Sequence, residues 1–263
     1  MTNESFTNIF DAAKSGSVED VKHFVEEQGV DVNVKGDEGK TPLFHATQHN
    51  SNVEVLKYLV SQGADVNAKS KWDSTPLHYV AGWSSSVEVL QYLVSQGAVV
   101  NAKHNNNGTP LEYAAVYSSN IEVVRYLISL STDAEITEKI VGDDWHGTSL
   151  HWAAMLGCFN AEVWEYQIAL GADVNKKARQ WFGKTPMHMA AKCHRSSIEM
   201  LQFLVSHGAD VHAKDEYGCT PLHNAVWQSY AKNSVETVQY LISQGVDVNA
   251  KSNNGIWVSS CLQ

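Results

Sequence analysis

The stretch from Thr41 to Lys69 reads TPLFHATQHNSNVEVLKYLVSQGADVNAK, and it returns from Thr75 to Lys103 as TPLHYVAGWSSSVEVLQYLVSQGAVVNAK. Four further copies follow with the same order of features. They begin at Thr109, Thr148, Thr185 and Thr220, so successive copies start 34, 34, 39, 37 and 35 residues apart. A motif that recurs at this period predicts an array of small stacked units.

Each copy carries the signals of two short helices and a turn. The Thr-Pro pair places a hydroxyl N-cap ahead of a proline at the first helical position, where the missing N–H costs nothing. In the second helix, Val53, Leu56 and Leu59 share one face, and Gly63 follows as a left-handed stop. The DVNAK segment then supplies a tight turn. In the longer copies the additions fall in loops, between Thr137 and Thr148, between Lys177 and Thr185, and around Ala231.

The order T-P-L-H-x-A, a second helix and G-A-D-V-N-A resembles the ankyrin repeat over roughly residues 5 to 255. The resemblance implies an all-α ankyrin-repeat solenoid of stacked helix-turn-helix pairs with β-turn or hairpin fingers. It divides the chain into an N-terminal capping repeat at 1–35, six repeats at 36–69, 70–103, 104–137, 138–177, 178–214 and 215–251, and a partial or truncated C-terminal repeat at 252–263.

Three places depart from the pattern. The first unit lacks TPLH, although Ser17 and Asp20 have the spacing of a capping box for its second helix. Further on, STDAEIT replaces GADVNAK and Ser149 replaces proline, which predicts the weakest stacking junction and an enlarged finger between the copies at Thr109 and Thr148. After Gly255 the chain reads IWVSSCLQ, which is either an improvised cap or a truncated repeat.

Composition and charge exclude several function classes. The net charge is -10 and no Lys/Arg cluster is longer than a pair, so we expect no nucleic-acid partner. No run of roughly 18 apolar residues exists and the polar start has no basic region, so we expect neither a membrane span nor a secretory signal. The cysteines form no CxxC pair and are expected to be reduced thiols in a cytoplasmic protein. They are Cys158, Cys193, Cys219 and Cys261.

The twelve histidines do not indicate a catalytic or metal site. His78, His151, His188 and His223 occupy the H of TPLH, where the resemblance implies hydrogen bonds that tie neighbouring turns together. None of the others belongs to an HExxH motif. GxSxG, P-loop and GxGxxG motifs do not occur either. We therefore expect no metal, no cofactor and no enzymatic activity.

The asparagines of the DVNA turns have two interpretations. They are Asn67, Asn101, Asn175 and Asn249. In the favoured one, each asparagine hydrogen-bonds its own backbone within the turn. In the other, which the resemblance suggests, they are substrates of asparaginyl hydroxylases.

The resemblance also implies that a partner binds on the concave side, at the finger tips and the exposed ends of the first helices. Aromatic residues are abundant there, and they bury a large area with few rotatable bonds. The predicted partner-binding residues are Lys71, Trp72, Trp83, Tyr117, Trp145, Trp181, Phe182, Tyr217 and Trp227. We expect Trp72, Trp83, Trp145 and Trp181 to form the energetic centre, although some of these rings could instead shield neighbouring repeats. An acidic partner would suit the lysines that end the VNAK-type segments, Lys35, Lys69, Lys103, Lys214 and Lys251.

The sequence thus predicts a scaffold that binds another protein by occupancy and is monomeric by itself. The identity of that protein is open, because ankyrin repeats serve many partners. Two alternatives also stay open. One is an inhibitor or effector that blocks a cellular enzyme, and the other is an adaptor fragment of a larger protein.

Overall fold

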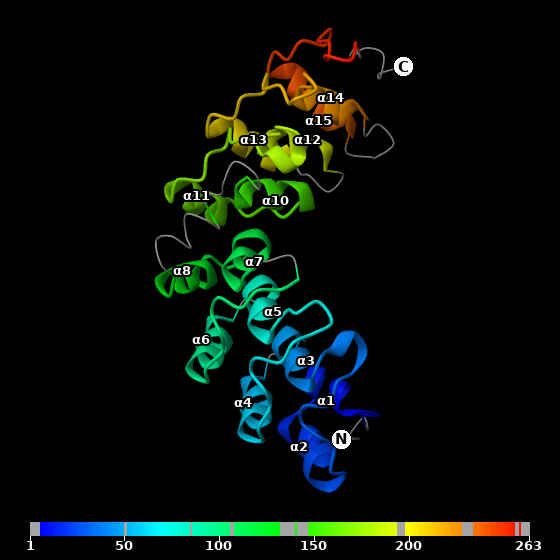
Figure 1. Cartoon of the computed structure of the whole chain (residues 1–263), viewed down its shortest axis with the longest axis vertical. Helices are drawn as coiled ribbons and strands as arrows, with labels where there is room; N and C mark the ends of the chain where they lie inside the picture. Colours follow the sequence, from blue (N-terminus) through cyan, green and yellow to red (C-terminus); the bar gives the residue numbers. More distant parts are fainter. Residues whose placement is uncertain are drawn as a thin grey trace. The chain divides into compact units, whose positions relative to one another are not determined.

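The computed structural model describes residues 6–49, 52–84, 86–105, 108–131, 140, 147–193, 198–227, 234–255 and 258. These residues belong to two compact units, Met1–Leu130 and Ser131–Gln263 (Figure 1). The boundary directly precedes the STDAEIT stretch, where the sequence predicts a weak junction. The enlarged finger expected between Thr137 and Thr148 lies outside the described residues, apart from Ile140 and Gly147.

Both units are built from pairs of short helices. The helices of the first unit are α1 (Ile9–Ser15), α2 (Val18–Lys22), α3 (Pro42–His49), α4 (Val53–Ser61), α5 (Pro76–Trp83), α6 (Val87–Ser95), α7 (Pro110–Tyr117) and α8 (Ile121–Ser129), with a π-helical turn at His23–Glu27 and a 3-10 turn at Asp37–Gly39. Those of the second unit are α10 (Ser149–Leu156), α11 (Ala161–Ala169), α12 (Pro186–Lys192), α13 (Ile198–Ser206), α14 (Pro221–Trp227) and α15 (Ser234–Ser243), with a 3-10 turn at Arg179–Trp181. The described ranges contain no β-strand, which confirms the all-α class.

First helices pack against first helices within each unit. The order is α1, α3, α5 and α7 in the first unit and α10, α12 and α14 in the second. Small side chains allow this close approach, because Ala81, Ala115 and Ala154 are at most 1% exposed. Second helices contact one another similarly, as α6 contacts α8 and α13 contacts α15.

Threonine and histidine close a capping box at the start of the first helices. The backbone N–H of Thr75 donates to Nδ1 of His78 over 3.1 Å, and Nε2 of the same ring lies 3.2 Å from the carbonyl oxygen of Gly108 in the next finger. The box recurs at Thr148 with His151, at Thr185 with His188 and at Thr220 with His223. The predicted tie between neighbouring turns is therefore confirmed for His78, His151 and His188. Burial lowers the pKa of His78, His151 and His188 to about 4.

The second helices bury the leucine stripe. In α4, Val55, Leu56 and Leu59 are at most 2% exposed, and Gly63 follows with a φ of 89°, a left-handed conformation that favours glycine. In α11, Trp164 takes the place of Leu56 and is 1% exposed. The core of each unit thus lies between its first and second helices.

Two of the turn asparagines, Asn67 and Asn175, require a correction, because their side chains bond the following repeat and not their own turn. Nδ2 of Asn67 donates to the carbonyl oxygen of Gly97 over 3.0 Å, and Oδ1 accepts from the N–H of Val99 over 2.8 Å. Asn33 and Asn175 make the same pair of bonds to the following repeat. The bond within the turn comes from Asp65, which accepts from the Asn67 N–H over 2.8 Å. An amide that satisfies two backbone groups of the next repeat locks the two repeats together.

The fingers are short turns that are bonded to one another through the backbone. The finger that carries Trp72 is closed by the Ser70 N–H on the carbonyl of Ser74 (3.0 Å), and the Trp72 carbonyl accepts from Asn105 of the next finger (3.0 Å). In the second unit, the Phe182 carbonyl accepts from Glu216 over 2.9 Å. These bonds fix where each exposed finger residue stands.

The two ends of the chain are described in part. At the N-terminus, Ser17 and Asp20 form the predicted capping box of α2. In the IWVSSCLQ tail, Val258 is buried and its N–H donates to the carbonyl of Ala250 over 3.2 Å. The other residues of the tail lie outside the described ranges.

Candidate partner-binding surface

In each of the two units, the exposed aromatic side chains lie on one surface. We call it the finger face, and it consists of the fingers together with the positions four, seven and eight residues after each repeat's threonine on the first helices. The described aromatic side chains with large exposed areas all belong to it, namely Trp72, Trp83, Trp152, Phe182, Tyr217 and Trp227. The large exposed hydrophobic side chains elsewhere in the described chain are aliphatic, namely Val99, Leu130, Val235 and Ile242.

In the first unit, three tyrosines hold Trp83. Its ring stacks on Tyr117, with centroids 5.1 Å apart and an interplanar angle of 28°, and it meets Tyr113 edge-on at 5.4 Å. Tyr79, one turn earlier on α5, tilts against it at 5.1 Å. We call these four residues the Trp83 cluster. Since Trp83 is still 49% exposed, it offers half of its surface in a fixed orientation, which lowers the entropic cost of binding.

Further rings fix the Trp83 cluster from behind. Tyr79 meets Phe44 of α3 edge-on at 5.4 Å. Tyr113 contacts His78 and His104, both at 5.2 Å, and burial raises the pKa of its hydroxyl. The cluster therefore continues into the packed interior of the first unit.

Trp72 stands on a finger and outside this cluster. It is 51% exposed, and the Lys71 ammonium lies 5.5 Å from its ring centroid. Within the described chain no ring contact joins Trp72 to the Trp83 cluster. The structure thus presents two separate aromatic sites in the first unit.

In the second unit, Trp181 is partly covered. Its ring stacks on His151 of the preceding repeat at 5.4 Å, and Trp152 meets it edge-on at 4.8 Å. Trp181 therefore shields a neighbouring repeat, while Trp152 is 39% exposed beside it. Phe182 of the same finger pairs with Tyr217 of the next finger at 5.2 Å.

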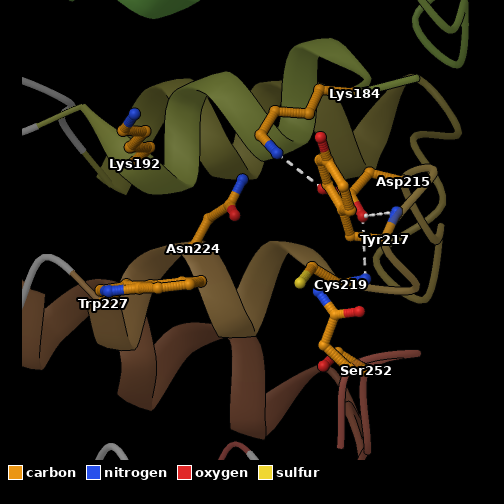
Figure 2. A pocket seen from close by; sticks show the side chains of 9 residues that line it. Lys184, Lys192, Asp215, Tyr217, Cys219, Asn224, Trp227 and Ser252 are labelled. Atoms are coloured by element: carbon orange, nitrogen blue, oxygen red, sulfur yellow. Dashed lines mark hydrogen bonds and ion pairs between the residues drawn. The ribbon is translucent and has the colours of Figure 1, made fainter. Parts of the chain in front are cut away.

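A groove of about 440 Å³ runs between α12 and α14, and we call it the α12–α14 groove (Figure 2). Lys192 and Trp227 lie at one end of it and Tyr217 lies at the other. Between them, Asn224 extends from α14 and donates to the carbonyl of His188 on α12 over 3.2 Å. Trp227 is 63% exposed, which makes it the most exposed of the described aromatic side chains on the finger face.

The α10–α12 groove, of about 280 Å³, lies on the other side of α12. Met155 of α10 and Met189 of α12 line it together with the finger residues Trp181 and Phe182. Lys184 and Lys192 border both grooves, so one helix separates two hollows that share the same two cations.

A buried ion pair fixes the finger beside these grooves. Oδ2 of Asp215, whose side chain has no exposed surface, lies 2.6 Å from Nζ of Lys184. Oδ1 accepts the N–H groups of Tyr217 and Cys219, each over 2.9 Å. Both carboxylate oxygens therefore have partners, as a buried charge requires.

The residues proposed as one energetic centre belong to different units. Trp72 and Trp83 belong to the first unit and Trp181 to the second, while Trp145 lies outside the described residues. The binding residues predicted from the sequence do not include Tyr79, Tyr113 and Trp152, which all occupy the x of T-P-L-H-x-A. The sequence contains a signal for these three residues, because their position and the one four residues later lie on the same face of the first helix.

The described ranges contain no group of three His, Cys, Asp or Glu side chains placed to hold a metal ion. No helix in those ranges combines the length and the apolar character needed to cross a membrane.

Comparisons with known proteins agree on the fold. The sequence matches the family model "Ankyrin repeats (3 copies)" at residues 9–104, 54–140 and 150–252. Among solved structures, the human ASB11 ankyrin repeat domain matches with a TM-score of 0.64 and 22% identity, over 92% of this chain and 99% of that one. No curated protein matches the chain in sequence. These matches confirm the resemblance and the solenoid of helix pairs.

Proposed function

We propose that this chain, which belongs to the ankyrin-repeat family, binds a partner protein through its finger face. Ankyrin repeats are generally protein–protein interaction modules, and they are typically scaffolds without enzymatic activity. The observation that carries the proposal is the segregation of exposed side chains. The described exposed aromatics all lie on the finger face, whereas the described large exposed hydrophobic side chains elsewhere are aliphatic.

Binding would act by occupancy and depend on a few aromatic anchors. Trp83 is held in place by three tyrosines, and Trp227 borders a groove. Rings of this kind supply much of the binding energy of protein interfaces, and truncation of a central one typically costs about 2 kcal/mol or more. We therefore assign the main contacts to Trp83 and Trp227, with Trp152 added to the residues predicted from the sequence.

The experiment is an affinity capture from cytosol of the source organism with the full chain. The native protein is compared with Trp83→Ala, with Trp227→Ala and with Ile242→Ala. Ile242 is the matched control, because it is a 40% exposed apolar residue on α15, away from the finger face. Circular dichroism verifies that each variant is folded.

We expect a partner that the native chain and the Ile242→Ala variant retain and that at least one tryptophan variant loses. Equal retention by all variants would place the site elsewhere on the chain and refute the assignment. Loss with the Ile242→Ala variant alone would place the site on the second helices.

A further inference from the structure

The repeat around α12 has a charge unlike the rest of the chain. From Val174 to Ile198 the sequence holds six of its 19 basic residues and none of its 29 acidic ones. The basic residues are Lys176, Lys177, Arg179, Lys184, Lys192 and Arg195, of which Arg195 lies outside the described ranges. On a chain with a net charge of -10, this segment forms a local positive field.

Two described lysines of this segment are bonded to groups of the next repeat. Nζ of Lys177 donates to the carbonyl oxygen of Lys214 over 2.7 Å, and Lys184 is paired with the buried Asp215. Lys192, in contrast, is exposed at the end of α12. Among the described residues, no carboxylate lies within ion-pair distance of it. Lys192 is therefore a cation that can be offered to a ligand.

Apolar walls lie on both sides of this cation. The α10–α12 groove presents Met155, Met189 and Phe182, and the α12–α14 groove presents Tyr217 and Trp227. Lys192 borders each of the two hollows, so a ligand that fills both lies beside its ammonium group. The two hollows therefore suit apolar side chains of a ligand, and Lys192 suits an anionic group between them.

We propose that the two grooves flanking α12 bind one extended acidic segment of a partner protein. Its apolar side chains fill the hollows, and an Asp or Glu carboxylate between them contacts Lys192. This assignment rests on the proposed function and names the chemistry of the partner. It differs from the lysine ladder suggested by the sequence, of which Lys35 donates to the carbonyl oxygen of Lys69 over 3.4 Å.

A single-stranded nucleic acid also favours basic and aromatic surfaces. Two observations favour the peptide. The chain as a whole carries a charge of -10, and Asp173 and Glu216 line the hollow that holds Lys176, Lys177 and Arg179. A strand of phosphates that followed the basic residues would meet these carboxylates.

The test is a selection of random dodecapeptides, displayed on phage, on the full native chain. The best peptides are then synthesised with a fluorescein label and titrated by anisotropy. We expect the selected pool to be enriched in Asp or Glu together with Leu, Phe or other apolar residues. Lys192→Glu should weaken the labelled peptides by about tenfold or more. Lys192→Arg should retain most of the affinity, and Lys57→Glu, at an exposed lysine of α4, should not change it.

A pool without acidic enrichment, or equal binding by Lys192→Glu, would overturn the proposal. So would labelled oligouridine that binds more tightly than the selected peptides, or self-association of the chain that Lys192→Glu abolishes. If the selection fails while partner capture is still lost with Trp83→Ala, the proposed function stands and this inference alone falls.

Discussion

The hydroxyl of Ser149 donates a hydrogen bond of 2.7 Å to Oε1 of Gln167, and both side chains are buried. Ser149 stands where the other full repeats have proline, and all five prolines of the chain occupy that position. Gln167 stands where those repeats have leucine, namely Leu59, Leu93, Leu127, Leu204 and Leu241. Two departures from the repeat pattern thus compensate each other, because a buried polar group requires a partner.

We predict that these two positions are energetically coupled. Gln167→Leu alone removes the closer acceptor of the buried Ser149 hydroxyl, whose other acceptor, the Ile140 carbonyl oxygen, lies 3.3 Å away. Ser149→Pro alone removes the donor, so each substitution should destabilise by about 1 to 3 kcal/mol. The double variant, which restores the residues of the other repeats, should be more stable than either single one. Urea unfolding of the four proteins gives the coupling free energy. Additive effects of the two substitutions would contradict this prediction.

Asn67→Ala should destabilise the first unit by about 1 to 3 kcal/mol, because it removes two hydrogen bonds to the next repeat. Asn249→Ala is the matched control. Asn249 occupies the same place in the last complete repeat, where its side chain is exposed. Chemical denaturation should show a smaller effect for Asn249→Ala, and equal losses would mean that the bonds between repeats contribute little.

Acidification should destabilise the fold through the capping-box histidines. Burial lowers the pKa of His78, His151 and His188 to about 4, whereas the unfolded chain has the ordinary value of 6.5. As the pH falls from 6.5 to 4, the unfolded state takes up these protons first, so the stability present above pH 6.5 is lost across this window. Each histidine accounts for up to roughly 3 kcal/mol.

The check is urea unfolding of the native chain and of His188→Gln at several pH values across that window. Glutamine does not titrate, so the free energy of unfolding of this variant should fall less steeply with decreasing pH. Identical slopes for the two proteins would show that His188 is not the group responsible.

The buried ion pair on the finger should matter more than exposed pairs. Lys184→Met leaves the carboxylate of Asp215 buried without its counter-charge, so we expect a loss of about 3 kcal/mol. The control is Lys57→Met, which breaks an exposed pair with Glu54 and should cost about 0.5 kcal/mol or less. Thermal or urea unfolding compares the two. If Lys184→Met is as mild as the control, then water or backbone donors already neutralise Asp215.

The sequence by itself determined where the helices are. Thr-Pro at Thr75, the leucine stripe around Leu59 and the stop at Gly63 act within one or two helical turns, so a linear pattern contains them. The resemblance to the ankyrin repeat identified the ring of His78 as structural. It also placed Trp83 and Trp227 on the surface, because both stand at helix-end positions that the core does not use.

Only the tertiary structure decided which groups meet. Asn67 bonds the repeat after its own, and Trp83 stacks on Tyr117 of α7 in the next repeat. Lys184 pairs with a carboxylate one repeat further on. These partners lie about one repeat apart in the chain. A periodic sequence indicates which face of its helix or turn each residue occupies, but not which group of the neighbouring repeat it contacts. The packing of one repeat on the next determines these partners, since it sets the distances between the buried polar groups and between the rings.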